Sequence, residues 1–346
     1  MPSSSISPVL RSGWDALARL ATVSPKGSKI TVGLDVGSSS LKAVALGPRR
    51  ALGPRPVLGH HLMELGQGGE VHLPQAIQRA VGALRVPTNA VTISVSGQWV
   101  IMRVIEMPVM KPEELALALP IEAQRYVPFR IEEVIVDGTI LGPGEANKMR
   151  VVLVACKRDL VERRVGWARQ AGVEPVAVDV DALAVANALG AGMAGDSPAA
   201  TQAVMNVGAQ WTNLAVVKGG VPYLIRDIPW GAEKLSRRVA EQTGLEDRAV
   251  AALLKQADAV PAPVQDALAI MCESLTTELQ LSFDFFENHF GPPPQQLAVT
   301  GGLAQSAGFL EGLRRHLPLP ALPWSPPGLS GQFSVAYGLA LRGGRS

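Results

Sequence analysis

The chain has few charged and few aromatic residues for its length, and it has no long hydrophobic run. Charged residues make up 18% of its 346 residues, aromatic residues make up 5%, and the formal net charge is +2. A nearly neutral chain has no strong electrostatic attraction to nucleic acid. No uninterrupted apolar stretch approaches the roughly 18 residues that a membrane helix needs. The composition therefore predicts neither a nucleic-acid-binding protein nor a membrane-spanning one.

Cysteine is almost absent, and potential metal ligands are scattered. Cys156 and Cys272 lie in apolar or helical patterns outside any CxxC pair, so we expect buried free thiols in a reducing cytoplasm. The five histidines show no metal-ligand spacing.

The first 27 residues are rich in Ser and Pro and lack the apolar segment of a secretory signal. We expect a loose leader over residues 1–27. Within it Leu10, Trp14 and Leu17 have helical spacing. They predict a short helix that either docks on the body of the protein or binds a membrane surface or a partner.

Two segments share the pattern strand, glycine turn, strand, and a third strand ends in a double glycine. They are Ile30–Lys42, Ala203–Val217 and Leu297–Ala304. The length favours two domains, and the pattern restarts after a Gly/Ala/Pro linker at 190–199. We therefore expect an internal structural duplication, with one lobe over 28–200 and a second over 201–346 that ends in a closing helix.

The remaining periodicity predicts alternating helices and strands. Helices are expected over 73–84, 113–126, 159–171, 181–189, most of 232–289, 309–317 and 334–342, and strands over 91–96, 100–107, 134–141, 149–155 and 176–180.

The first glycine turn has the residues of a phosphate-binding loop. Gly37 permits a tight turn and a close approach of the backbone. Successive N–H groups can point at phosphate oxygens as an anion nest; they belong to Ser38, Ser39 and Ser40. Lys42 adds positive charge near the β- and γ-phosphates, and Asp35 can hold Mg²⁺ through water. An ordinary hairpin is the alternative.

The second glycine turn differs at the position of its acid. Gly208 and Thr212 are placed to close on the same phosphates, but Asn206 stands where an acid is expected. An amide carbonyl accepts a hydrogen bond from a metal-bound water but brings no negative charge, so we expect weaker metal binding and water activation.

The third motif predicts the nucleoside site. Gly301 and Gly302 would let a base or a ribose lie against bare backbone. Glu233, Lys234 and Arg237, on the helix after Gly231, are candidates for the ribose and adenine edge, or else form a solvated charged face.

The order of these motifs resembles the actin-like ATPase superfamily. The matching positions are Asp35-x-Gly37, Gly208-x-x-x-Thr212, Thr300-Gly301-Gly302 and Ala336-x-Gly338-Leu339-Ala340. The resemblance implies an α/β, actin-like, two-lobed fold (ribonuclease H-like and duplicated) that binds ATP and Mg²⁺. It also implies that Lys42 contacts phosphate and that Asp181 positions the hydrolytic water. With Asn206 in place of an acid, we expect weak or absent ATPase activity.

Within that superfamily the chain is similar to the PilM family of type IV pilus assembly proteins. The similarity lies in Gly33–Lys42, Val100–Pro108 and Ile121–Phe129, the last with a Glu-Ala-x-x-Tyr-Val-Pro-Phe signature. It implies an inserted subdomain, called 1C, over about 96–170.

The resemblance further implies an ATP-binding cytoplasmic scaffold, peripheral to the inner membrane through its partner. That partner would be a PilN-like membrane protein, bound by its N-terminal cytoplasmic peptide in a groove between subdomains 1A and 1C. The candidate lining comes from Val91–Val95, Val100–Val104 and Leu115–Val127, whose apolar residues could instead simply form the core. Pilus motor ATPases and further copies of the chain are additional candidate partners.

Two alternatives stay open. An FtsA-like polymerising division protein normally ends in an amphipathic membrane helix, which we do not expect at Gly343–Ser346. A small-molecule kinase would need a catalytic aspartate, which Asp179 or Asp181 could supply, but the segment 100–150 has the wrong character for one.

Overall fold

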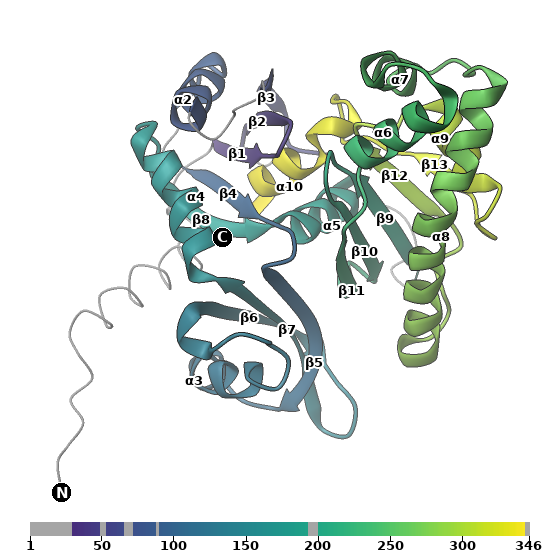
Figure 1. Ribbon diagram of the computed structural model, residues 1–346. Helices are drawn as coiled ribbons and strands as arrows, with labels where there is room; N and C mark the ends of the chain where they lie inside the picture. The colour runs from purple at the N-terminus through teal and green to yellow at the C-terminus, as the bar shows by residue number, and fades with distance from the viewer. Residues whose placement is uncertain (1–29, 49–52, 66–71, 88–89, 193–199, 343–346) are drawn as a thin grey trace, which may run out of the picture.

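The computed structural model describes residues 30–48, 53–65, 72–87, 90–192 and 200–342. Over these residues the strands form three sheets (Figure 1). Two five-stranded sheets have the orders β3-β2-β1-β4-β8 and β11-β10-β9-β12-β13, and a three-stranded sheet has the order β5-β7-β6. We call the parts built on the two larger sheets the first and second lobes. The predicted leader, 1–27, lies outside the described residues.

The first lobe is built around a central strand that follows the predicted pattern. Its strands are β1 (Thr31–Val36), β2 (Ser40–Leu46), β3 (Val57–Glu64), β4 (Val91–Val95) and β8 (Pro175–Val180). β1 pairs antiparallel with β2 and parallel with β4. All six residues of β1 are buried, as expected for a strand with both faces covered. Helices α2 (Leu73–Ala83) and α4 (Arg158–Gln170) pack against each other and complete this core.

The second lobe repeats the pairing of the first. Its strands are β9 (Thr201–Val207), β10 (Thr212–Lys218), β11 (Val221–Ile228), β12 (Leu297–Gly301) and β13 (Ala321–Pro323). β9 pairs antiparallel with β10 and parallel with β12, so the predicted structural duplication is confirmed. Its helices are α6 (Ala232–Thr243), α7 (Asp247–Leu254), α8 (Ala262–Phe290) and α9 (Ala307–Arg314). α9 begins two residues earlier than predicted because the Ser306 side chain accepts a hydrogen bond from the Phe309 N–H and caps the helix.

Two helices cross between the lobes, and glycine makes their contact possible. α5 (Asp181–Gly192) follows β8, and α10 (Ser334–Arg342) is the predicted closing helix (Figure 1). A side chain at Gly338 would overlap the Ala184 carbonyl of α5, and one at Gly33 would overlap the Ala336 carbonyl of α10. The glycines in these motifs therefore serve close packing between β1, α5 and α10.

The three-stranded sheet forms a separate unit that extends below the first lobe in Figure 1. It contains β5 (Val100–Pro108), β6 (Val134–Pro143), β7 (Lys148–Lys157) and helix α3 (Pro112–Ala123), with its own hydrophobic core. This sheet lies inside the predicted insertion, 96–170, but α4 at the end of that range packs against α2 and β4 of the first lobe. The boundaries 28–200, 201–346 and 96–170 stay predictions.

The sheet also contacts the second lobe, because Arg150 on β7 donates a hydrogen bond of 2.8 Å to the Tyr223 hydroxyl on β11.

Two expectations from composition can be compared with the structure. Cys156 and Cys272 are free and buried, and burial raises the pKa of each thiol to about 12. Among the described helices, none is both long and apolar enough to cross a membrane.

A polar site between the two lobes

The first glycine turn presents exposed serines beside a shielded ion pair. The Gly37 N–H donates to the Ser40 carbonyl at 3.1 Å and closes the turn between β1 and β2. Asp35 and Lys42 face each other across the two strands, with 3.2 Å between Oδ2 and Nζ. Ser38 and Ser39 are exposed at the tip. The turn therefore offers backbone and hydroxyl groups to a ligand, next to a cation already held in place.

The second glycine turn closes in the same way but faces a helix. The Gly208 N–H donates to the Trp211 carbonyl at 3.0 Å. The N-terminal end of α6 is hydrogen-bonded to the carbonyls of this glycine turn. The Ala232 N–H donates to the Gly208 carbonyl and the Glu233 N–H donates to the Ala209 carbonyl, each at 2.9 Å. This arrangement fixes α6 relative to the turn.

Thr212 was predicted to close on the phosphates, but its side chain is fully buried. Its hydroxyl donates to the Trp230 carbonyl at 2.7 Å. The hydroxyl therefore holds the connection between β11 and α6.

A chain of polar side chains runs from the second turn into the first lobe. Asn206 Nδ2 donates to Asn213 Oδ1 at 2.8 Å, and Asn213 Nδ2 donates to Asp227 Oδ1 at 2.7 Å. The other carboxylate oxygen of Asp227 accepts a hydrogen bond of 2.8 Å from the Gly97 N–H in the first lobe. At the same place Trp211 lies against Gly97, where a Cβ would be 3.3 Å from the indole ring. The second turn is thus linked to the other lobe through Asp227 and through the contact of Trp211 with Gly97.

Sequence reasoning missed Asp227, because no glycine turn marks it. The available signal was a carboxylate within the apolar strand that follows the second hairpin.

Carboxylates from both lobes act on one another electrostatically beside these turns. Burial raises the pKa of Asp181 to about 7, and the nearby charges of Asp35 and Asp227 add to that rise. Hydrogen bonds from Ser94 and Ser96 act in the opposite direction. Burial also raises the pKa of Asp227, against hydrogen bonds from Gly97 and Asn213 that lower it. The three aspartates therefore share one electrostatic environment.

Asp179, the other carboxylate considered for a kinase, is buried and lies 2.8 Å from Arg342 Nη1. This ion pair ties β8 to the end of α10 and leaves Asp181 as the carboxylate beside the turns.

The double glycine contains one packed position and one open position. Gly301 has a φ of +94°, and a Cβ there would lie 2.8 Å from Asn206 Oδ1 and closer still to the Val207 carbonyl. Gly302 is exposed, and a Cβ there would meet nothing within 4 Å. Gly301 therefore allows β12 to pack against the second turn, whereas Gly302 leaves free space at its surface.

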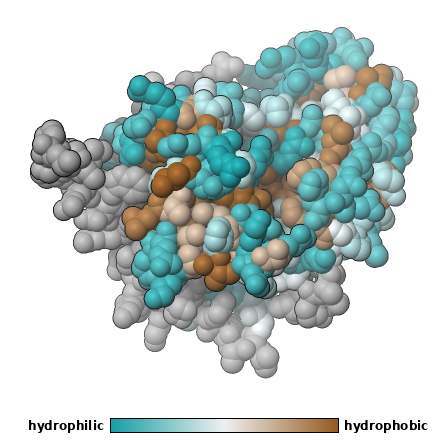
Figure 2. Space-filling view, turned by 90° about the horizontal axis from the view of Figure 1, so that it is seen from below, coloured by the Kyte–Doolittle hydropathy of each residue, from teal (hydrophilic) through white to brown (hydrophobic). Residues whose placement is uncertain are grey.

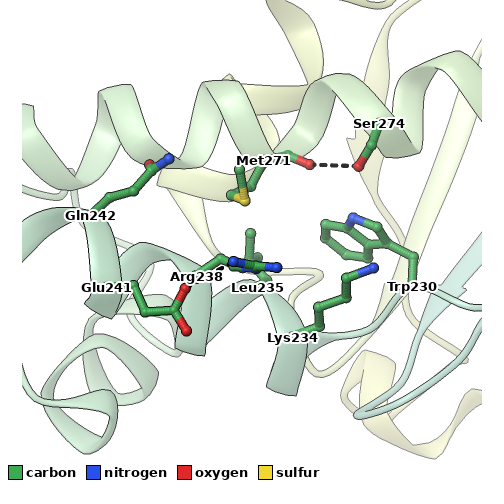
Figure 3. A pocket seen from close by; sticks show the side chains of 8 residues that line it. All are labelled: Trp230, Lys234, Leu235, Arg238, Glu241, Gln242, Met271 and Ser274. Carbon is green, nitrogen blue, oxygen red and sulfur yellow. Dashed lines mark hydrogen bonds and ion pairs between the residues drawn. The ribbon is translucent and has the colours of Figure 1, made fainter.

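The charged residues of α6 line cavities next to the second turn. A cavity of about 410 Å³ is lined by Ala209, Gln210, Glu233, Lys234, Arg237, Arg238 and Glu241. A second cavity, of about 300 Å³, lies between α6 and α8 (Figure 3), where Met271 of α8 points toward Leu235 and Arg238 of α6. Neither cavity includes the first turn or Gly302. Glu233, Lys234 and Arg237 are therefore brought to the second turn, and the ligand edge that they would contact stays a prediction.

The donors and acceptors at this site fit a magnesium–nucleotide better than a metal ion alone. Among the described residues, no group of three or more His, Cys, Asp or Glu side chains could hold a metal ion. Mg²⁺ commonly keeps several waters and binds through one or two carboxylates and substrate phosphates. Asp35 beside the exposed Ser38–Ser39 turn, with Lys42 in reach and open space at Gly302, suits that arrangement.

The surface beside the three-stranded sheet carries hydrophobic groups. Figure 2, seen from below, shows hydrophobic residues interspersed with polar ones on this side of the molecule. Trp99, 40% exposed, packs against Phe129 with 5.7 Å between ring centroids. Lys157 Nζ lies within 5 Å of the centroid of each ring, at 4.6 and 4.8 Å. These three residues, which we call the Trp99 cluster, lie where the first lobe joins the three-stranded sheet. On α3, Leu117 and Ile121 are 78% and 72% exposed.

The predicted groove lining needs one correction. All five residues of Val91–Val95 are buried in β4, between β1 and β8, so the prediction that they line a surface groove is wrong. The physical reason is that a central parallel strand is covered on both faces.

Two lobes with the same strand order, joined by crossing helices, define the actin-like ATPase fold, and the chain has this fold. A family model described as "Type IV pilus assembly protein PilM" matches residues 33–323. The chain belongs to this PilM family, which confirms the resemblance identified from its motifs.

Solved structures agree with this assignment. A chain of the "PilM-PilN type IV pilus biogenesis complex" is 25% identical, with a TM-score of 0.80, and the match covers 93% of this chain and 100% of that one. Ethanolamine utilization protein EutJ from Carboxydothermus hydrogenoformans is 15% identical, with a TM-score of 0.55, over 96% of this chain and 98% of that one. The second match supports the fold alone.

Proposed function

We propose that this protein is an ATP-binding scaffold of the type IV pilus assembly platform on the cytoplasmic side of the inner membrane. There it would capture the N-terminal cytoplasmic peptide of a PilN-like membrane protein. Membership of the PilM family and the similarity to a chain of the PilM–PilN complex support the pilus assembly role. The nucleotide-binding part is carried by one observation, the Asp35–Lys42 ion pair beside the exposed Ser38–Ser39 turn.

In this proposal the two glycine turns and the double glycine contact different parts of ATP. The N–H groups of the first turn face the phosphates, and Lys42 and Asp35 supply the cation and the acceptor for Mg²⁺-bound water. Gly302 leaves room for the nucleoside. When bound, Mg²⁺ neutralises charge on the phosphates.

Hydrolysis is expected to be slow. Asp181 lies at the start of α5, where it would orient water, but with a pKa of about 7 it is only partly ionised at neutral pH. Asn206 adds no charge of its own. We therefore expect ATP binding without rapid turnover.

The partner peptide is proposed to bind along the three-stranded sheet, next to the Trp99 cluster. β5 is an edge strand of that sheet, and an extended peptide can add to a sheet edge while placing apolar side chains in pockets. Exposed aromatic residues are common anchors for such peptides. An interface of this size would have an affinity on the order of micromolar, strengthened by avidity in an assembly. The exposed apolar face of α3 is then available to motor ATPases or to further copies of the chain.

Two titrations on the full chain test this proposal. Calorimetry should detect ATP binding that tightens with Mg²⁺, and no binding with or without Mg²⁺ would exclude the nucleotide role. A fluorescent peptide, copied from the cytoplasmic N-terminus of a PilN-like membrane protein of the same cell, should bind wild type and lose affinity in Trp99→Ala. Leu281→Ala is the matched control, because Leu281 is also a partly exposed apolar residue, 57% exposed, but lies on α8 of the second lobe. Equal affinity in wild type and Trp99→Ala would exclude the Trp99 cluster as the binding surface.

A further inference from the structure

The polar chain from Asn206 to Gly97 has only one orientation that satisfies every group. Both carboxylate oxygens of Asp227 accept, one from Gly97 N–H and the other from Asn213 Nδ2. An ionised carboxylate only accepts hydrogen bonds, whereas an Asn side chain has one donating end and one accepting end. Asp227 therefore requires Asn213 to turn its Nδ2 toward it.

This constraint passes to Asn206. Because Asn213 turns its Nδ2 toward Asp227, it presents its Oδ1 to Asn206. Asn206 must therefore donate a hydrogen bond to that oxygen from its own Nδ2. The Oδ1 of Asn206 is then turned toward Gly301, within 2.8 Å of where a Cβ on that glycine would lie. Asn206 and Asn213 are nearly fully buried, and burial makes an unsatisfied amide unfavourable, so the orientation is strongly held.

We propose that Asp227 is a positioning residue of the nucleotide site, which acts through Asn213 to hold the Asn206 carbonyl oxygen toward the double glycine. There that oxygen would be available to accept a hydrogen bond from water on the Mg²⁺ that accompanies the nucleotide. The orientation of the Asn206 amide follows from the hydrogen bonds that connect Asn206, Asn213, Asp227 and Gly97. Only the identity of the ligand rests on the proposed function. The missing acid of the second turn is thereby replaced in part by a carboxylate on β11.

Substitution of Asp227 by asparagine should reverse the orientation of the Asn213 and Asn206 side-chain amides. The carbonyl oxygen of the introduced amide can keep the bond from Gly97 N–H, but its NH₂ group then needs an acceptor from Asn213. Asn213 would flip, Asn206 would flip in turn, and Asn206 would present Nδ2 instead of Oδ1 to Gly301. The double variant Asn213→Asp/Asp227→Asn removes this conflict, because an acid at position 213 accepts from both neighbours and returns Asn206 to its original orientation.

NMR on the nucleotide-free protein tests the orientation. We expect weak NOEs between the Asn206 side-chain amide protons and the Gly301 α-protons in wild type, strong ones in Asp227→Asn, and weak ones again in the double variant. Unchanged NOEs in Asp227→Asn would overturn the proposal, whether or not nucleotide binds.

ATP titrations with and without Mg²⁺ test the consequence. In wild type Mg²⁺ should tighten ATP binding, and Asp227→Asn should lose about tenfold of that tightening, the effect of one hydrogen bond to a charged group. Metal-free ATP affinity should not fall, because Asp227→Asn removes a negative charge beside the phosphates, and the double variant should recover the Mg²⁺ dependence, which a merely structural role of Asp227 would not produce. Inverted NOEs with an unchanged Mg²⁺ dependence would overturn the positioning role. If wild type binds no ATP, the proposed function fails, and the NMR comparison still decides the orientation.

Discussion

The two glycine turns have the same backbone and different chemistry. In each, the glycine N–H closes the hairpin by donating to a carbonyl three residues later, at 3.1 Å for Gly37 and 3.0 Å for Gly208. The first turn carries an ion pair between its own strands, Lys42 and Asp35. The second carries neutral amides and a buried Thr212 hydroxyl, and its carboxylate comes from β11.

This difference separates two roles that a duplicated fold could otherwise share. The polar contacts of the first turn stay within the first lobe, because the Ser39 carbonyl accepts from the Leu65 N–H and the Val36 carbonyl accepts from Arg164 on α4. The first turn can therefore adapt to a ligand without disturbing the second lobe. The second turn is bonded to α6 behind it and, through Asp227, to Gly97 across the lobes. We infer that the first turn supplies charge, whereas the second supplies rigid placement.

The largest effect on ATP affinity is expected at Gly302, where the nucleoside would lie beside the two turns. Gly302→Trp should reduce ATP affinity by more than about a hundredfold, because a bulky side chain would occupy that space. Its fold should be unchanged, since a Cβ at Gly302 meets nothing within 4 Å. Gly82→Trp on α2 is the matched control, because that position is equally open. Calorimetry and circular dichroism check both variants, and normal ATP affinity in folded Gly302→Trp would refute the site.

A next comparison separates the charges of the first turn from the packing of the second. Lys42→Ala should weaken ATP binding by about 10- to 100-fold, the effect of one or more lost hydrogen bonds to a charged group. Thr212→Val should leave ATP affinity near that of wild type but lower the free energy of unfolding by about 1–3 kcal/mol, because the Trp230 carbonyl loses its donor. Urea unfolding and ATP titration measure the two quantities. If both variants lost ATP affinity and stability to the same extent, the first turn would not differ from the second in supplying charge.

Restoring an acid to the second turn should sharpen the comparison. An acid at position 206 should raise turnover or Mg²⁺ affinity, since it adds charge near the metal. Alone, however, Asn206→Asp faces the Asn213 carbonyl and should lose about 1–3 kcal/mol of stability. Asn206→Asp/Asp227→Asn satisfies every group when Asn213 flips, so it should be the more stable and more active of the two. If the steady-state ATPase rate falls in both variants, the missing acid at position 206 is not the reason for slow hydrolysis.

The last effect is expected on stability and not on ATP affinity, and it comes from titration of Asp181, whose pKa responds to Asp35 and Asp227 of the two lobes. Its pKa is raised to about 7 in the folded protein, above the value of roughly 3.9 for an unfolded aspartate. The folded state therefore binds more protons than the unfolded state in this range, and this group's contribution to stability is lost as pH rises toward 7. Asp181→Asn should show a smaller fall in melting temperature between about pH 5 and pH 8 than wild type. Equal slopes in thermal melts would contradict the raised pKa.

The glycine motifs could be predicted because they are local. A tight turn or a close helix contact requires glycine at a given position, so Gly37, Gly208, Gly301 and Gly338 are visible in the sequence whatever surrounds them. Strand periodicity likewise indicated the duplicated pattern. The burial of Val91–Val95 could not be read in this way, because an apolar strand looks the same in a core and beside a groove.

The sequence by itself thus determined the turns, the order of strands and helices, and the family that their motifs indicate. Only the tertiary structure decided which polar groups meet. Asp227 bonds to Gly97, 130 residues away in the chain, and Trp99 meets Lys157 through the return of β7 to β5. Such contacts depend on strand register and on how the two lobes pack. Neither property follows from local spacing, because each is fixed by the burial of residues from distant segments in a common core.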